Sequence, residues 1–314
     1  MRLVAAANLV AGMFLLVGAC AQPDETTPAT SAHAGVRMVA VAPAVHLEVV
    51  DWGGSGAPMV FLVGMGMEAA DYERFASRFR DKYHVYGINR RGTGASSIPP
   101  DGYDSATRAH DIVVVLDSLR IDKAILVGHS FAADELSKVG VAYAARVRAL
   151  VYLDAYNYPG PGLERMPPLP PQATRGLKQA PTRSDSVLVA SLEATDTDTT
   201  TRAPVIDSDS MARAGVESAD YSRLTVPALA IYADQATTAA ELFAGEYERF
   251  DARNKAMARR FAEARMQELR DVRDRFRTQV RRGTVLVIPG ASHFVYKSNP
   301  DDVEHAMRGF LAAL

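Results

Sequence analysis

The sequence predicts an α/β fold: a mostly parallel central sheet with helices on both faces and an irregular lid inserted before the penultimate strand. Short apolar runs alternate with helical patterns of about ten to fifteen residues from position 36 to 156, and the alternation resumes after position 225. This alternation indicates βαβ units, because two parallel strands need a crossover connection, which is usually a helix. Most of the runs are apolar throughout, which is typical of strands buried on both faces.

Each strand is predicted from a run of apolar or β-branched residues that ends in loop chemistry. The first two strands, 36–42 and 45–51, are joined by a short turn at Pro43. The others are predicted over 59–63, 83–88, 124–127, 149–153, 228–233 and 284–288.

The helices are predicted from apolar residues at three- and four-residue spacing. They cover 71–81, 105–119, a segment that starts near Ser130, and 300–314. Asn299 is a suitable N-cap for the last helix, with Pro300 at its first position. A longer stretch, 236–281, carries a single apolar stripe, and its many arginines are interpreted as a solvated face rather than a binding patch.

Residues 157–224 interrupt the alternation and separate the two parts of the predicted core, 36–156 and 225–314. Prolines between 159 and 171 forbid a regular helix, and a Thr/Asp run follows over 195–201. An insertion at the carboxyl end of a parallel sheet lies where ligands bind, so it is interpreted as a lid. The alternative is a disordered surface excursion.

Residues 1–19 are predicted to be a signal peptide that does not belong to the fold. An apolar run over 9–18 is too short to span a bilayer comfortably. The run ends in V-G-A-C, which resembles a lipobox, and Cys20 is the only cysteine of the chain. We therefore expect a lipid on Cys20 and a flexible tether over 20–35. Because Ala21 and not Asp follows, the resemblance implies an exported lipoprotein of the outer membrane that faces the periplasm; the alternative is an ordinary secretory signal.

Composition excludes several classes of function. A formal net charge of −2 leaves no basic footprint for nucleic acid. With one cysteine, no His-x-x-x-His pair and no carboxylates clustered at ligand spacing, the sequence predicts no metal site. No phosphate-binding glycine loop follows the first strand, so no cofactor is predicted.

The strongest local signal is L-V-G-H-S-F-A over 126–132, where a predicted strand turns into a helix. Such a turn raises a serine hydroxyl above the edge of the sheet, and small neighbours let strand and helix approach each other. Gly128 meets that need, while Ala132 adds a methyl group at the second small position. Ser130 is therefore a candidate nucleophile, and a serine that only caps the helix is the alternative.

His293 is the candidate general base. Among the seven histidines, it alone lies in a strand-to-helix loop at the carboxyl edge of the sheet, where Ser130 also lies. A hydroxyl needs a base to accept its proton, and imidazole titrates near neutral pH. The alternative is a loop histidine exposed to solvent.

These motifs together resemble the α/β-hydrolase superfamily, from about Leu47 to the C-terminus. F-L-V-G-M-G over 61–66 is similar to the family's oxyanion loop, R-G-T-G-A-S over 91–96 to its R-G-x-G-x-S turn, and P-G-A-S-H-F over 289–294 to the segment that bears the catalytic histidine. The resemblance implies an oxyanion hole made by the backbone N–H groups of Met65 and Phe131. Val63 and Asn89 depart from common family residues and assign no subfamily.

The triad acid has two candidates, because two predicted strands end in aspartate. The family's usual acid position falls on Ala236, which cannot serve, and Asp234 is close to it but early. Asp154 matches the variant in which the acid follows the preceding strand, so it is preferred and Asp234 is kept as the alternative. Either carboxylate could instead cap the segment that follows it.

We expect a cofactor-free serine hydrolase that cleaves a carboxylic ester, or else an amide or thioester, through an acyl-enzyme. Its partners would be a small ester-type substrate and, through the anchor, a membrane. Dehalogenase and epoxide hydrolase chemistry need a carboxylate nucleophile, and position 130 is serine. The alternative is a lipid-anchored binding protein that keeps this fold without turnover.

Overall fold

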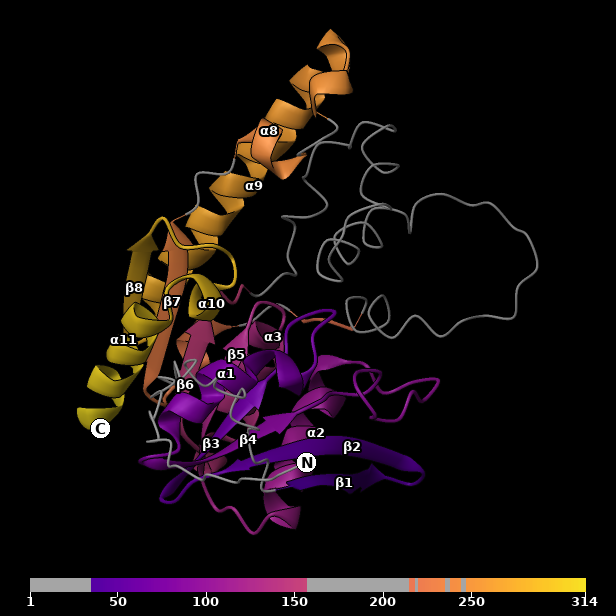
Figure 1. Ribbon diagram of the computed structural model, residues 1–314, viewed down its shortest axis with the longest axis vertical. Helices are drawn as coiled ribbons and strands as arrows, with labels where there is room; N and C mark the ends of the chain where they lie inside the picture. Colours follow the sequence, from indigo (N-terminus) through magenta and orange to yellow (C-terminus); the bar gives the residue numbers. More distant parts are fainter. Residues whose placement is uncertain (1–34, 157–214, 218–219, 235–237, 244–246) are drawn as a thin grey trace, which may run out of the picture. The chain divides into compact units, whose positions relative to one another are not determined.

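The computed structural model describes residues 35–156, 215–217, 220–234, 238–243 and 247–314, all within one compact unit of the chain, residues 33–314. Its sheet has eight strands in the order β1-β2-β4-β3-β5-β6-β7-β8, from indigo β1 to gold β8 in Figure 1. The strands are β1 (Gly35–Ala42), β2 (Val45–Gly53), β3 (Ala57–Leu62), β4 (Tyr83–Ile88), β5 (Ala124–His129), β6 (Val147–Leu153), β7 (Ala228–Asp234) and β8 (Gly283–Pro289).

The prediction of a mostly parallel sheet is confirmed. Only the two N-terminal pairings, β1 with β2 and β2 with β4, are antiparallel among the described strands. From β4 through β3, β5, β6 and β7 to β8 every pairing is parallel. The carboxyl ends of β5, β6, β7 and β8 therefore share one edge, where side chains from distant parts of the chain can meet.

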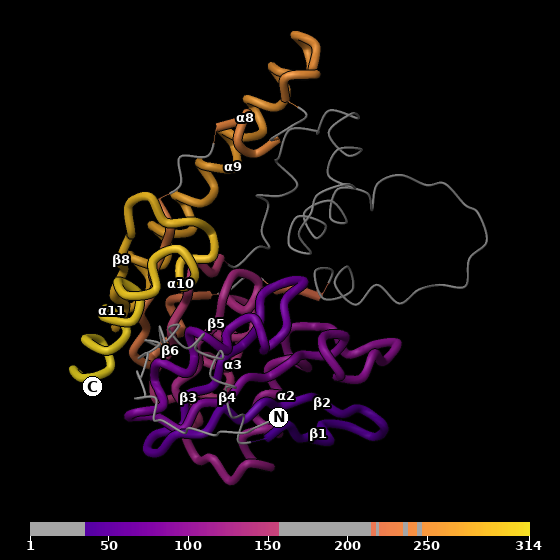
Figure 2. Tube along the Cα trace, in the orientation of Figure 1, coloured from indigo at the N-terminus to yellow at the C-terminus, as the bar shows by residue number. Residues whose placement is uncertain are grey.

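Helices cover both faces of the sheet, because side chains alternate between faces along each strand. One face packs on α2 (Ser105–Ser118), α3 (Ala132–Ala142) and the C-terminal half of α9 (Ala252–Gln279). The other face packs on α1 (Glu73–Ala76), α10 (Val295–Ser298) and α11 (Pro300–Ala312). The C-terminal helices α10 and α11, yellow in Figure 2, lie against β7.

The helix predicted over 71–81 is instead three short pieces, η1 (Ala69–Tyr72), α1 and η2 (Ser77–Phe79). The turn starts earlier than expected, where Glu68 and Asp71 form a capping box. The α-helix gives way to the 3₁₀ helix η2 at Ser77. The Ser77 hydroxyl donates to the Arg74 carbonyl at 3.1 Å and so competes with regular helix bonding.

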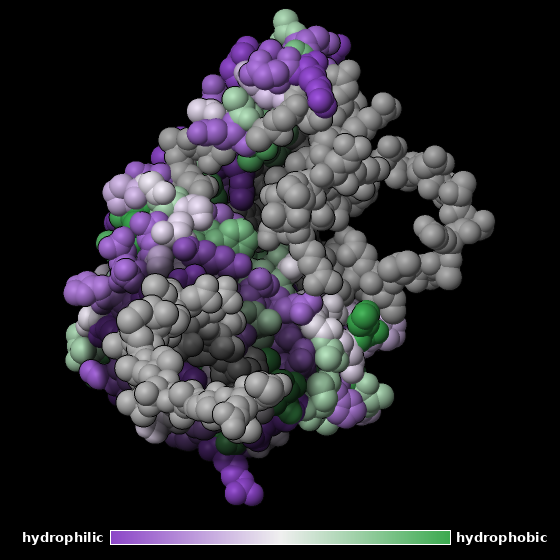
Figure 3. All heavy atoms as spheres, viewed as in Figure 1, coloured by the Kyte–Doolittle hydropathy of each residue, from purple (hydrophilic) through white to green (hydrophobic). Residues whose placement is uncertain are grey.

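The long helical stretch predicted over 236–281 is also divided. It contains α8 (Ala239–Leu242), η5 (Tyr247–Arg249) and α9, which begins where the Asp251 carboxylate accepts the Asn254 N–H at 2.8 Å. Phe276 of α9 packs on Tyr152 and, with Val272, joins the main core, whereas Phe261 lies in a separate cluster with α8. The surface over α8 and α9 is mostly hydrophilic (Figure 3).

The predicted lid lies mostly outside the described residues. Its last residues form η4 (Tyr221–Arg223), where Tyr221 and Leu224 are buried in the main core. A further short turn, η3 (Ala144–Arg146), connects α3 to β6. Within the described ranges, no helix combines the length and the apolarity that crossing a bilayer requires.

Candidate active site

Ser130 stands at the sharp turn between β5 and α3. Its backbone has φ +53°, a left-handed conformation that costs a non-glycine residue about 1–2 kcal/mol. The turn is held by the Ser130 N–H, which donates to the Leu153 carbonyl at 3.2 Å, and by the Ser130 carbonyl, which accepts the Ala133 N–H at 3.1 Å. A strained backbone that its surroundings hold in place is typical of a functional position.

Gly128 allows strand and helix to approach at this turn. A Cβ on Gly128 would lie 2.7 Å from the Ala132 Cβ and 3.0 Å from the Leu136 Cδ1. The methyl of Ala132, which departs from the family pattern, therefore occupies the space that Gly128 leaves open. Ala132 is fully buried.

His293 lies in the loop between β8 and α10, and both of its ring nitrogens are hydrogen-bonded. Nε2 is 3.0 Å from the Ser130 Oγ, and Nδ1 is 2.7 Å from the Asp154 Oδ2. A carboxylate only accepts, so Nδ1 carries the proton and Nε2 is left to accept from the serine hydroxyl. The side chain is 39% exposed, so a substrate can approach the ring.

Asp154 follows β6 and is held on all sides. Its backbone has φ +42°, and its N–H donates to the Ile231 carbonyl at 2.7 Å. Its Oδ1 accepts from the Ala233 N–H and from the Tyr156 hydroxyl, both at 2.8 Å. The side chain is 5% exposed, and these bonds hold its carboxylate in one orientation toward the imidazole.

Asp234, the alternative acid, is the last residue of β7 and is exposed. Its register partner on β8 is Pro289. The structure thus brings Ser130, His293 and Asp154 together, while both ring nitrogens of His293 are already bonded without Asp234.

His129 supports the loop that carries His293, a role that the sequence analysis did not identify. Its Nε2–H donates to the His293 carbonyl at 2.9 Å, and its ring stacks on Phe294 with the centroids 4.9 Å apart. Burial, and secondarily the nearby His293, hold the pKa of His129 well below its usual value, so the ring is neutral. In the sequence, only the position of His129 directly before Ser130 pointed to a role in the site.

Met65 and Phe131, the candidate oxyanion donors, lie in the loop after β3 and at the N-cap of α3. Neither backbone N–H has an acceptor within the described part of the chain. The N-terminus of α3 adds a partial positive charge beside Phe131. Met65, Tyr103 and Val216 pack around the Phe131 ring and form an apolar cluster over this side of the site.

Other predicted features lie elsewhere or outside the described residues. Residues 1–34, with Cys20, are not described. No group of three or more potential metal ligands occurs in the part of the chain that was described. The residues that line a small cavity include Leu62, Arg90, Arg108 and Glu135.

Comparisons with known proteins identify the family to which the fold belongs. A model of the alpha/beta hydrolase family matches residues 59–306. The 2-(acetamidomethylene)succinate hydrolase of Mesorhizobium japonicum is 33% identical over 105 residues, 33% of this chain and 38% of that protein. Epoxide hydrolase A of Mycobacterium tuberculosis is 33% identical over 135 residues, 42% of this chain and 40% of that protein. The chain spans about two fifths of the length of these curated relatives.

One solved structure extends the likeness over the whole fold. The crystal structure of E-2-(acetamidomethylene)succinate hydrolase has a TM-score of 0.57 and 23% identity, and the match covers 88% of this chain and 98% of that one. At that identity the match describes the fold alone. Because the family model covers most of the sequence and the sheet has the matching architecture, the chain belongs to the alpha/beta hydrolase family.

Proposed function

We propose that this chain is a serine hydrolase that cleaves a carboxylic ester through an acyl-enzyme. Ser130 is the nucleophile, His293 the general base and Asp154 the acid. The observation that carries the proposal is the unbroken hydrogen-bond chain from the Ser130 Oγ through both nitrogens of His293 to the Asp154 Oδ2. Nucleophile, base and orienting carboxylate in this order form the arrangement that activates a serine.

The proton transfers of the reaction follow this hydrogen-bond chain. The Ser130 Oγ attacks the carbonyl carbon while its proton moves to the His293 Nε2, and Asp154 stabilises the imidazolium. The tetrahedral oxyanion accepts hydrogen bonds from the N–H groups of Met65 and Phe131. The carbonyl then re-forms as the alkoxide leaves with the proton from Nε2. Water repeats the sequence on the acyl-enzyme and frees the carboxylic acid.

The oxyanion donors account for part of the rate enhancement. One such N–H typically stabilises the transition state by about 3 kcal/mol relative to its absence. The donors proposed here belong to different elements, the loop after β3 and the first turn of α3. Their alignment therefore depends on tertiary packing between the two.

The proposed reaction, ester cleavage by a serine, differs from the reactions that the names of the relatives state. One relative is an epoxide hydrolase and another hydrolyses 2-(acetamidomethylene)succinate, by their names. Attack on an epoxide by a carboxylate is excluded at position 130, because the residue is serine. An ester is preferred because its alkoxide leaves more readily than an amide nitrogen.

A series of p-nitrophenyl esters of increasing acyl length tests the proposal. The purified protein should release p-nitrophenolate with turnover, with a burst if deacylation is slow, and Ser130→Ala should lose this activity. Amides and thioesters with the best acyl group would then rank the leaving groups. Saturable binding of the esters with no hydrolysis by the wild-type protein would support the alternative, a binding protein without turnover.

For localisation, we propose that residues 1–19 are removed and that Cys20 is lipidated, anchoring the protein to the outer membrane on its periplasmic side. The support is the apolar run and the V-G-A-C junction. Cys20→Ser should release the protein from membranes or block its maturation. Unchanged membrane association, with the signal still attached, would contradict lipidation.

A further inference from the structure

Arg90 is a buried arginine that joins α3 to the loop bearing Met65. The residue follows β4, and its side chain is 7% exposed. On one side, its Nε donates to the Glu135 Oε1 at 2.7 Å and its Nη2 to the Oε2 at 3.2 Å. On the other side, Nη1 donates to the Gly64 carbonyl at 3.0 Å, and Nη2 donates to the carbonyl of Val63.

The bond to the Gly64 carbonyl fixes the direction of the Met65 N–H. That carbonyl and that N–H belong to one planar peptide unit, and the described chain contains no cis peptide bond. In a trans unit the C=O and the N–H point in opposite directions. While Arg90 holds the Gly64 oxygen, the Met65 N–H must point away from Arg90. A rotated peptide would turn the donor away from a substrate.

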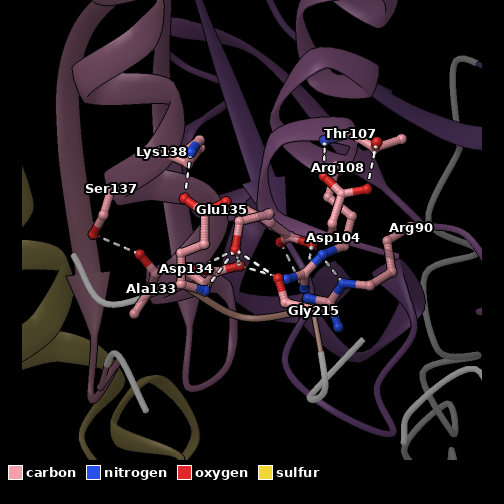
Figure 4. Close-up of polar contacts among 12 residues, drawn as sticks. Arg90, Asp104, Thr107, Arg108, Ala133, Asp134, Glu135, Ser137, Lys138 and Gly215 are labelled. Atoms are coloured by element: carbon pink, nitrogen blue, oxygen red, sulfur yellow. Dashed lines mark hydrogen bonds and ion pairs between the residues drawn. The ribbon is translucent and has the colours of Figure 1, made fainter. Parts of the chain in front are cut away.

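The second proposed donor rests on the same charged cluster. The Cζ of Arg90 lies 5.0 Å from the Phe131 ring centroid, and the Cζ of Arg108 lies 4.8 Å from it. Arg108 forms an ion pair with Asp134, the neighbour of Glu135 on α3, and Figure 4 shows the four charged side chains together. Arg90, Arg108, Asp134 and Glu135 carry two charges of each sign, so the buried cluster is neutral.

The four buried charges are not explained by a gain in the stability of the fold. A buried ion pair is often no more stabilising than apolar side chains of the same volume, because both ions lose their hydration. Burial raises the pKa of Asp134 to about 6, despite the neighbouring Arg108. What an apolar residue at position 90 could not do is donate two hydrogen bonds to successive carbonyls of the loop.

We infer that Arg90, held by Glu135, is a positioning residue that orients the Gly64–Met65 peptide as an oxyanion donor. The inference rests on the proposed function, since it gives the Met65 N–H a role in that reaction. Without Arg90 the peptide rotates freely, and the loss should equal that of one oxyanion donor, about 10²- to 10³-fold in kcat. Substrate binding in the ground state should change little.

The test compares Arg90→Met with Arg91→Met. Arg91 is a matched control because it is about as buried and pairs with Asp111 through two bonds, 2.6 and 2.9 Å. Among the described residues, no hydrogen bond joins its side chain to the loop that bears Met65. Arg90→Met should lower kcat about 10²- to 10³-fold with KM nearly unchanged. It should weaken binding of a boronic acid transition-state analogue by a similar factor. Arg91→Met, compared at equal folded fraction, should shift neither quantity more than a few-fold.

Two further variants separate positioning from folding. Arg90→Met leaves Glu135 with only its longer ion pair to Arg108, at 3.7 Å. Arg90→Met/Glu135→Leu removes both charges and should fold with a melting temperature near that of the wild type. It should be as slow as the single variant. Arg90→Lys, which can still donate to one carbonyl, should recover part of the rate.

The outcomes separate this inference from the proposed function. If the folded double variant retains the kcat and analogue affinity of Arg91→Met, Arg90 does not position the donor and the inference is wrong. If Ser130→Ala also retains hydrolysis, the proposed function fails as well. Loss of hydrolysis in Ser130→Ala, with wild-type rates in Arg90→Met and in the double variant, overturns the inference alone.

Discussion

The two halves of the candidate site are held by different forces. On the acid–base side, Asp154 and His293 are fixed by neutral donors: the Ala233 N–H, the Tyr156 hydroxyl and the His129 Nε2–H. On the oxyanion side, buried ions of α2, α3 and the loop after β4 hold the loop that bears Met65 and the Phe131 ring.

The two kinds of support suit the groups that they orient. A carboxylate that already bears a charge is best oriented by neutral dipoles, which do not compete with the imidazole for it. A flexible loop with carbonyls to restrain needs a strong multidentate donor, and a guanidinium supplies one. We therefore expect changes on the acid–base side to act on proton transfer, and changes on the oxyanion side to act on transition-state binding.

The largest expected effect comes from a substitution that disrupts only the acid–base side. Asp154→Asn should lower turnover on the order of 10⁴-fold with little change in KM, because the amide cannot stabilise the imidazolium or keep the proton on Nδ1. Asp234→Asn is the matched control and should cost far less, since that side chain is exposed. Steady-state kinetics on the best p-nitrophenyl ester measures both.

The reverse ranking would move the acid to Asp234. Equal and large losses, in variants whose melting temperatures match the wild type, would contradict a single acid. If neither variant slows a reaction that Ser130→Ala abolishes, the reaction runs on Ser130 and His293 alone.

A smaller effect tests the turn that both halves share. Gly128→Ala forces its Cβ against the Ala132 Cβ at 2.7 Å, so we expect a loss of about 1–3 kcal/mol in the free energy of unfolding. Activity should fall with it, because Ser130 and Phe131 both follow this position. Urea denaturation and kinetics on the same preparations measure the two losses.

Gly309→Ala provides the control for that experiment. Gly309 lies within α11, and a Cβ there meets nothing within 4 Å. This change should raise the free energy of unfolding by about 0.5–1 kcal/mol and leave activity unchanged. A Gly128→Ala protein as stable and active as Gly309→Ala would show that the close approach at the turn is not needed.

The smallest expected effect is a pH dependence of stability caused by His129. It tests whether this group of the acid–base half is neutral in the folded protein. Burial keeps the pKa of His129 well below its usual value, whereas in the unfolded chain this histidine has a pKa of about 6.5. As the pH falls below that value the unfolded state binds the proton first, so stability is lost on acidification. His129→Gln keeps an N–H donor but cannot titrate.

We therefore expect the difference in unfolding free energy between wild type and His129→Gln to change by at most about 1.4 kcal/mol per pH unit below 6.5. Urea titrations from pH 7.5 to 5 measure it. A difference that does not depend on pH would mean that His129 is protonated in the folded protein as readily as in the unfolded one.

The contacts of the acid–base half follow from the sequence more directly than those of the oxyanion half, for a physical reason. Ser130, Asp154 and His293 each follow a strand, and the carboxyl ends of parallel strands share one edge, so strand prediction alone brings them close. Arg90 meets Glu135 and His129 meets the His293 carbonyl through packing between distant segments, which no local pattern records.

The same distinction holds for the fold. Runs of apolar or β-branched residues predicted all eight described strands to within a few residues. The signal is clearest in β5, β6 and β7, because a buried parallel strand leaves little choice of composition. The helix over 71–81 was wrong in detail, since the Ser77 hydroxyl bonds to the backbone, a local choice that apolar spacing does not reveal. The cap at Asp251 likewise divided one predicted helical stretch.

The central claim is that Ser130 is activated by His293, and its reaction with a fluorophosphonate tests this most directly. Attack by the Ser130 Oγ expels fluoride and leaves a stable phosphonyl ester, which intact-mass and peptide mass spectrometry locate. We predict one adduct per chain, on Ser130, formed rapidly in the wild type, much more slowly in His293→Ala and not at all in Ser130→Ala. A wild-type protein that stays unmodified, or that carries the adduct on another residue, would contradict the account.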